Sequence, residues 1–520
     1  MRRATLALLL AAGLTAAAAA FDPAAPIPAD GLRSDMTALE QLLQQSHPGL
    51  YRYVPQGAMD RALASAARAI DKPMDEAKFY GEVTALLAKV KDGHTRAFLS
   101  GDYRRYLREE ARLFPVTLRC TDGRLFVVDS PGNEVPKGLE VLAINGDTTA
   151  RLVGTMLDHV SGDADILTGK YARITDDFQT YYAVFFGRPR AFLLHLRDAA
   201  GKKSSATVMA MTQADLAEAG GHDPDPKPAA PPLRLEMLSG GKVAVMTLET
   251  FALPAEDEGG PNYAKFLATS FAELKRAGTS DLVIDLRGND GGANDGPLLV
   301  SYLVDKPVRF YDSVEAVSAG FSLLHQYSHL GPEFDDKFDG HLLSIENSDR
   351  YRMIGDAELA PEPIAPQKDV FKGKVVVLID GRVFSTAAQL CSVLRSQKRA
   401  TFVGEETGGA YHGNASGELV VVTLPASKLK VTIPVLRYEM AGSDKAAARR
   451  GIVPDHPASP DDALAQALDL VKARPASRPR APGARRRRVS RRAGRARSEA
   501  RRSGRRSRRG RPAPASPAGA

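Results

Sequence analysis

A buried strand that turns directly into a helix is the feature of this sequence that most restricts its fold. The strand is Val375–Asp380, VVVLID, an apolar and largely β-branched run. A short turn, Gly381–Phe384, follows, and Ser385 then begins a run with apolar residues at helical spacing. The free N–H groups and the macrodipole of a helix N-terminus favour negative charge. The pattern fits a nucleophilic serine beside a developing oxyanion, or a serine that only caps the helix.

A second apolar strand runs into a glycine-rich turn upstream. This stretch, Asp281–Gly292, reads DLVIDLRGNDGG. Glycines in such a turn let the backbone approach a ligand closely and point N–H groups inward. Strands and amphipathic helices alternate through residues 235–475, which predicts a mixed α/β domain.

Four motifs in a fixed order resemble the C-terminal processing, or tail-specific, serine peptidases. DLRGNDGG resembles the glycine turn that precedes the nucleophile in that family, and RATFVGEETGG (Arg399–Gly409) resembles the motif that follows it. DGHT (Asp92–Thr95) lies far upstream and GIVPD (Gly451–Asp455) lies downstream. Several ordered motifs are more specific than any one of them alone. DGHT resembles the branch of the family that uses a histidine.

The resemblance implies that Ser385 is the nucleophile and His94 the general base. An imidazole can accept a serine proton near neutral pH and return it to a leaving amine. The alternative for His94 is a turn histidine bonded to local backbone. The other branch of the family uses a lysine just beyond the VGExTxG stretch, where this chain has Ala410, so a serine–lysine dyad is disfavoured.

By the same resemblance, the N–H groups of Gly292 and Thr386 form the oxyanion hole. The glycine turn departs from the family pattern, because Asp290 stands where a glycine is usual. The acid of the triad stays open: Asp444, Glu439 or none, because alanine or arginine occupies the usual position. The resemblance implies no metal and no organic cofactor.

The chain divides into six segments by composition and pattern, and the resemblance implies a crotonase-like ββα fold for the largest. Residues 105–212 resemble a small PDZ-like module, which in the family captures the substrate C-terminus as an added strand. The predicted segments are a signal peptide (1–20), an N-terminal helical domain with DGHT (21–104), a PDZ-like β-rich domain (105–212), a linker (213–234), the catalytic domain (235–475) and a disordered arginine-rich tail (476–520).

The net charge of +8 comes from the two ends of the chain. Residues 476–520 hold 17 Arg and 1 Glu, and Arg2 and Arg3 lie in the predicted signal peptide, which leaves −10 for the rest. No specific nucleic-acid binding is therefore expected of the folded part. The tail fits contact with an anionic envelope, or no selected role at all. The signal peptide predicts an exported protein, periplasmic or secreted.

These observations predict an exported serine endopeptidase of the tail-specific type that acts on proteins or peptides. The alternative is a non-catalytic protein on the same fold that binds an apolar ligand or a peptide, as the altered glycine turn and the unassigned acid would suggest. A third reading is an envelope-binding protein that acts through its arginine tail. The natural substrate, the cleavage site and the oligomeric state are not predicted by the sequence.

Overall fold

The computed structural model describes residues 21–219, 230–354 and 363–472. The predicted signal peptide, residues 220–229 of the predicted linker and the arginine-rich tail lie outside these residues. Within the described part of the chain, no helix is long and apolar enough to cross a membrane. The described residues form a mixed α/β protein, which confirms the general fold class.

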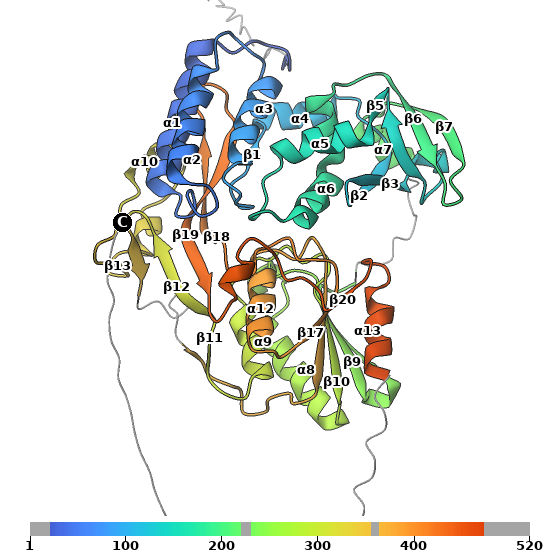
Figure 1. The fold of residues 1–520 in the computed structure, drawn as a ribbon, viewed down its shortest axis with the longest axis vertical. Coiled ribbons are helices and arrows are strands. Elements are labelled where there is room, and N and C mark those ends of the chain that lie inside the picture. Colours follow the sequence, from blue (N-terminus) through green and yellow to red (C-terminus); the bar gives the residue numbers. More distant parts are fainter. Residues whose placement is uncertain (1–20, 220–229, 355–362, 473–520) are drawn as a thin grey trace, which may run out of the picture. The chain divides into compact units, whose positions relative to one another are not determined.

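A six-stranded sheet, mostly parallel, forms the centre of the C-terminal part (Figure 1). Its strand order is β20-β17-β16-β10-β9-β8, and only the β8–β9 pair is antiparallel. The strands are β8 (Leu233–Leu238), β9 (Val243–Leu248), β10 (Asp281–Asp285), β16 (Lys374–Ile379), β17 (Thr401–Gly404) and β20 (His456–Pro457). Strands β10 and β16 are buried almost along their whole length, because helices cover both faces of the sheet.

Helix α13 (Ala463–Lys472) covers one face of this sheet, and three helices cover the other (Figure 1). The three are α8 (Tyr263–Ala277), α9 (Gly296–Leu303) and α12 (Ser385–Ser396). Successive side chains of β16 point to opposite faces of the sheet. Val376 and Leu378 therefore pack with α13, while Val377 packs in the core on the other face. Helix α8 ends at Gly278 in the left-handed conformation, as its sequence predicts.

Parallel pairing brings the two motif-bearing turns to one edge of the sheet. Asp285 of β10 lies opposite Leu378 of β16, so both strands end at the same edge. The glycine turn leaves β10 there, and the turn that leads to Ser385 leaves β16 there. Ligand sites of open α/β sheets lie at this carboxyl edge.

The N-terminal part is helical, and its one short strand joins it to a second sheet. Strand β1 (Ala97–Phe98), directly after DGHT, pairs antiparallel with β19 (Lys430–Met440). The predicted hairpin is present as β18 (Ala415–Thr423) and β19. The N-terminal helices are α1 (Ala29–Ser46), α2 (Gln56–Arg68), α3 (Glu76–Leu87) and α4 (Gly101–Glu109). They share one hydrophobic core with the C-terminal sheets.

The remaining strands of the second sheet, and a small two-stranded sheet, lie between α9 and β16 in sequence. The second sheet has the order β1-β19-β12-β14-β13, with β18 paired to β19, and β11 pairs with β15. The strands are β11 (Val308–Arg309), β12 (Tyr311–Ala316), β13 (Leu342–Ser344), β14 (Tyr351–Met353) and β15 (Pro363–Ile364); two short helices, α10 (Ser322–Tyr327) and α11 (Glu333–Asp336), lie between β12 and β13.

The β-rich module has a separate hydrophobic core, formed by residues 114–210. Its antiparallel sheet has the order β2-β3-β4-β6-β7, with β5 paired to β4. Its elements are β2 (Thr117–Thr121), β3 (Arg124–Asp129), β4 (Glu140–Ile144), β5 (Asp147–Thr148), α5 (Thr149–His159), α6 (Leu167–Phe185), β6 (Ala191–Arg197) and β7 (Lys203–Met209). Helix α6, which the sequence analysis does not anticipate, connects this module to the catalytic groove described below.

The segment predicted as a linker, 213–234, is not a plain linker at its ends. Helix α7 (Gln213–Ala219) begins it, and β8 starts at Leu233. The helix forms because Thr212 and Asp215 cap one another: the Asp215 N–H donates to Thr212 Oγ1, and the Thr212 N–H donates to Asp215 Oδ2.

A buried carboxylate fixes α1 to the turn of the β18–β19 hairpin. Asp35 is 1% exposed and accepts the N–H groups of Ala426 at 2.9 Å and Ser427 at 2.7 Å. We expect Asp35→Ala to lower the free energy of unfolding by about 2–4 kcal/mol, because two buried donors lose their acceptor. Urea denaturation measures this loss. The control Asp30→Ala, at an exposed position of the same helix, should change stability by less than about 0.5 kcal/mol, and an equal effect of the two substitutions would contradict the prediction.

Candidate active site

Ser385 lies at the first residue of α12 in a strained conformation. Its φ of 49° is in the left-handed region, which residues with a side chain rarely adopt. The interpretation of Ser385 as a helix cap is wrong, because Phe384 occupies the N-cap position and no side chain caps the helix. The sharp turn instead exposes the hydroxyl to a cavity, as in the nucleophile elbows of serine hydrolases.

His94 lies next to Ser385, although 291 residues separate them in the chain. Its Nε2 is 3.1 Å from Ser385 Oγ, and its ring packs on Phe384 at a centroid distance of 4.5 Å. Thr432 of β19 donates its hydroxyl to the His94 carbonyl at 2.6 Å. The β1–β19 pairing and this bond hold the DGHT turn over the nucleophile.

Asp92 faces the other ring nitrogen of His94. The distance from His94 Nδ1 to Asp92 Oδ1 is 3.8 Å, and both atoms are buried without a hydrogen-bond partner. Both side chains are almost completely inaccessible, with His94 8% exposed. A closer approach of at least about 0.6 Å would bring the two atoms to hydrogen-bond distance and form the bond that orients a catalytic histidine.

The second oxygen of Asp92 is held by neighbouring side chains. The Thr95 hydroxyl donates to Asp92 Oδ2, and His47 Nε2 lies 3.2 Å from the same oxygen. The Gly49 N–H donates to His47 Nδ1 at 3.0 Å, so the His47 proton is on Nε2 and points toward Thr95 Oγ1, 2.6 Å away, and Asp92 Oδ2. Burial opposes the charge of Asp92, but the interactions with His47 and His94 outweigh it and lower the pKa of Asp92 below its ordinary value.

Asp163 joins the DGHT turn to the segment that follows the nucleophile helix. Its two oxygens accept the N–H groups of Gly93 at 2.8 Å and Ala410 at 3.1 Å. Burial, and then the charge of Asp92, raise the pKa of Asp163. Ligand-type atoms of Asp92, His94 and Asp163 lie within 4.8 Å of one another, a spacing that could hold a metal ion. Three of the four carboxylate oxygens already accept hydrogen bonds from the protein, which favours acid–base chemistry here.

The predicted oxyanion residues lie beside the nucleophile. Gly292 has a φ of 140°, and a methyl group there would lie 2.0 Å from the backbone nitrogen of Ala252, so only glycine fits. The Thr386 hydroxyl donates to the Gly292 carbonyl at 3.2 Å. Gly291 is equally restricted, since a methyl group on it would lie 2.6 Å from Ser385 Cβ. The glycine turn thus packs directly against Ser385 and Thr386, and the roles of their N–H groups stay a prediction.

A groove of about 890 Å³ contains these residues. Ser385, His94, Gly292 and Thr386 all line it, as does Asp290, so the departure from the family pattern places a carboxylate at the groove. A groove of this volume accommodates a segment of several amino-acid residues or a drug-sized molecule.

The two acids proposed from the sequence do not contact His94. Glu439 lies 3.0 Å from His412 Nε2 and 3.1 Å from Arg52 Nη2, and Asp444 accepts the Ala446 N–H at the start of a short 3-10 turn. Asp92, which the sequence analysis missed as an acid, is two residues before His94. The signal that could have found it is the DGHT motif itself, which supplies a carboxylate and an imidazole in one turn.

Comparison with known proteins identifies a family that matches part of the chain. Residues 242–458 match the model of peptidase family S41. This match lies within the predicted catalytic domain and supports the predicted class, a tail-specific serine-type peptidase.

The solved structures that it resembles include three of CPAF, which support the fold. Mature CPAF is 17% identical with a TM-score of 0.57, over 85% of this chain and 96% of that chain. Its complex with lactacystin is 17% identical with a TM-score of 0.58, over 85% and 98%. A CPAF mutant is 16% identical with a TM-score of 0.62, over 85% and 96%.

Proposed function

We propose that this protein is an exported serine endopeptidase that uses Ser385 as nucleophile and His94 as general base. The observation that carries the proposal is the 3.1 Å approach of His94 Nε2 to Ser385 Oγ at the carboxyl edge of the sheet. The family match supports protein or peptide substrates. Export rests on the sequence pattern of residues 1–20, and a periplasmic or secreted location follows from it.

In the first half of the reaction, Ser385 Oγ attacks the peptide carbonyl carbon while His94 Nε2 takes the hydroxyl proton. The N–H groups of Gly292 and Thr386 stabilise the oxyanion that forms. Asp92 receives the Nδ1–H of His94, so that Nε2 starts as the acceptor and the imidazolium is stabilised. His94 then gives its proton to the leaving amine, and an acyl-enzyme remains.

In the second half, a water molecule attacks the acyl carbon of Ser385. His94 takes a proton from this water and returns it to Ser385 Oγ as the ester bond breaks. The products are a free carboxylic acid and the original serine, so the cycle needs no group beyond these side chains and backbone donors.

The finer fold assignments also remain proposals. The sheet of β8–β10, β16, β17 and β20 with its covering helices supports a crotonase-like catalytic domain. The antiparallel sheet of residues 117–209, with edge strands β2 and β7, supports a PDZ-like module that captures a peptide by strand addition.

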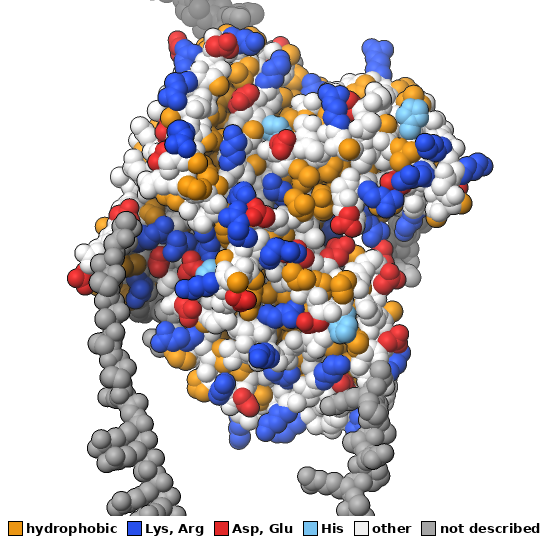
Figure 2. Space-filling model, in the orientation of Figure 1, with side chains coloured by type: hydrophobic (Ala, Val, Ile, Leu, Met, Phe, Trp, Pro, Cys, Tyr) orange, Lys and Arg blue, Asp and Glu red, His pale blue; other side chains and the backbone are white. Residues whose placement is uncertain are grey.

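Acidic and basic side chains are interspersed on the face that Figure 2 shows, so this face presents no broad basic surface for nucleic acid.

A fluorescent serine-reactive phosphonate tests the proposal on protein that begins at residue 21. We expect the wild type to be labelled at Ser385 and Ser385→Ala to be unlabelled. The matched control is Ser416→Ala, because Ser416 lines the same groove but its hydroxyl donates to Asn414. Equal labelling of wild type and Ser385→Ala would overturn the proposal. Folded wild type that resists both the phosphonate and lactacystin, which CPAF binds, would favour a binding protein on this fold.

A further inference from the structure

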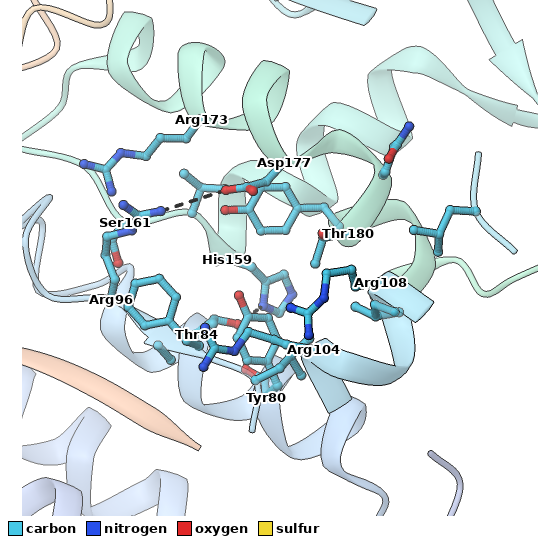
Figure 3. A pocket seen from close by; sticks show the side chains of 18 of the residues that line it. Tyr80, Thr84, Arg96, Arg104, Arg108, His159, Ser161, Arg173, Asp177 and Thr180 are labelled. Atoms are coloured by element: carbon cyan, nitrogen blue, oxygen red, sulfur yellow. Dashed lines mark hydrogen bonds and ion pairs between the residues drawn. The ribbon is translucent and has the colours of Figure 1, made fainter. Parts of the chain in front are cut away.

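A second cavity, of about 490 Å³, lies between the N-terminal helices and the β-rich module. Figure 3 shows Arg173, Asp177 and Thr180 on α6 at one side of it and Tyr80 and Thr84 on α3 at the other. The proposed reaction uses none of these side chains. The cavity shares part of its wall with the catalytic groove, through Arg96, Phe98, Arg173 and Asp177.

The charge of this cavity is strongly positive. Four arginines line it against a single carboxylate, that of Asp177; they are Arg96, Arg104, Arg108 and Arg173. Arg96 approaches Asp177 only to 3.9 Å, and Arg108 pairs with its chain neighbour Glu109. Most of the positive charge is therefore not neutralised within the cavity.

One of the arginines has an unused buried donor. The Nη1 of Arg173 is buried and has no hydrogen-bond partner, while the guanidinium stacks over Phe384 at 5.0 Å. Burial and the charge of Arg96 lower the pKa of Arg173 to about 10. A buried donor without an acceptor is uncommon in proteins, and Arg173 lines the cavity. Arg104, by contrast, is exposed.

The rest of the lining is apolar and aromatic. It includes Phe98, Leu99, Leu107, Leu113, Val160 and Tyr181. A cavity of a few hundred cubic ångströms with an apolar body and a few convergent polar groups is typical of small-molecule sites. Guanidinium groups bind planar oxyanions through paired hydrogen bonds.

We propose that this cavity binds an amphipathic organic anion, with its carboxylate on Arg173 and its apolar body on the leucine and aromatic wall. The carboxylate supplies the acceptor that Arg173 Nη1 lacks, and the four arginines favour its charge. Two sources share this chemistry: the C-terminal carboxylate of a peptide, and a free organic acid.

Isothermal titration of the full mature chain with defined probes tests the proposal. The probes are N-acetyl-phenylalanine, its neutral amide, 4-phenylbutyrate, and a tripeptide that ends in phenylalanine with a free carboxylate. The titration uses Ser385→Ala protein, so that no peptide bond is cleaved and the result does not depend on the proposed catalysis. We expect the acids to bind at least about tenfold more tightly than the amide, because a charge-assisted hydrogen bond is lost in the amide.

Matched variants assign the binding to the cavity. Arg173→Gln should weaken binding of N-acetyl-phenylalanine at least about tenfold, while Arg105→Gln, at an exposed position that pairs with Asp102, should leave it unchanged. Equal binding of acid and amide, equal effects at positions 173 and 105, or no binding of any acid at millimolar concentration would overturn the proposal. If the tripeptide binds more tightly than 4-phenylbutyrate, the natural ligand is a peptide terminus; the reverse order indicates a free acid.

Discussion

Ser385→Ala is expected to lower kcat/KM for a peptide substrate by roughly 10⁴- to 10⁶-fold. The hydroxyl at the start of α12 is the one nucleophilic group within hydrogen-bond distance of His94 in the described residues. Without it no acyl-enzyme can form, and the residual rate reflects only substrate binding and the oxyanion donors. Quenched fluorescent peptides, or casein digestion for an unknown specificity, measure the loss.

His94→Ala should cause a loss of similar size, because the serine proton then has no acceptor. The double variant should be no slower than either single one, since the two side chains act as a unit. Ser416→Ala, in the same groove, should retain at least about half of the wild-type rate, because the Ser416 hydroxyl bonds Asn414 and neither Ser385 nor His94. Losses that multiply in the double variant, or full activity of Ser385→Ala, would contradict the serine–histidine mechanism.

The sequence predicted that Ser385 and His94 lie at one site, and the two residues were found by different signals. Ser385 lies in a short, continuous strand–turn–helix unit, whose pattern is visible locally. His94 lies 291 residues earlier, and only the motif resemblance linked the two. The structure explains the link, because residues 97–98 pair with β19 and bring the turn before them to the carboxyl edge of the central sheet.

The acid was not predictable in the same way. The resemblance to the family placed the acid downstream of the nucleophile, at Glu439 or Asp444. In the structure, Glu439 forms ion pairs with His412 and with arginines, and Asp444 caps a turn. Which carboxylate faces His94 depends on the backbone path through Asp92–Thr95 and on the partners that hold Asp92. One of these partners is His47, in a segment that the motifs do not connect to catalysis.

The same limit applies to the second cavity. Arg96, Arg104 and Arg173 belong to three different elements, and nothing in their spacing predicts that they converge. Helix α6 brings Arg173 to this cavity, because the helix extends from the β-rich module and packs against the turn that carries Phe384. Long-range packing of this kind has no periodic signature in a single sequence.

Asp92→Asn is expected to lower kcat by roughly 10³- to 10⁴-fold while KM changes little. The Thr95 hydroxyl donates to the Oδ2 position, and the His47 Nε2–H points toward Thr95 Oγ1 and Oδ2, so the amide oxygen takes that place. The amide NH₂ then faces His94 Nδ1 and donates to it. His94 is thereby fixed with its proton on Nε2, where it cannot accept the proton of Ser385.

The controls for this prediction are the two acids that the sequence proposed. Glu439→Gln and Asp444→Asn should keep kcat within about threefold of wild type, since neither side chain contacts His94 and each substitution preserves the shape of the side chain. Circular dichroism and thermal unfolding would show whether Asp92→Asn is folded. A wild-type rate in folded Asp92→Asn, or a large loss in Glu439→Gln, would assign the orienting role to another group.

The acid side of the pH profile gives an independent test of the same assignment. Because the pKa of Asp92 is lowered by His47 and His94, the carboxylate stays ionised as the pH falls through the range in which a histidine gains its proton. Activity should therefore fall toward low pH with the slope of a single proton, taken up by the general base, as measured by kcat/KM. A two-proton slope would mean that Asp92 is protonated together with His94, and the charged Asp92 could then not be the group that orients the base.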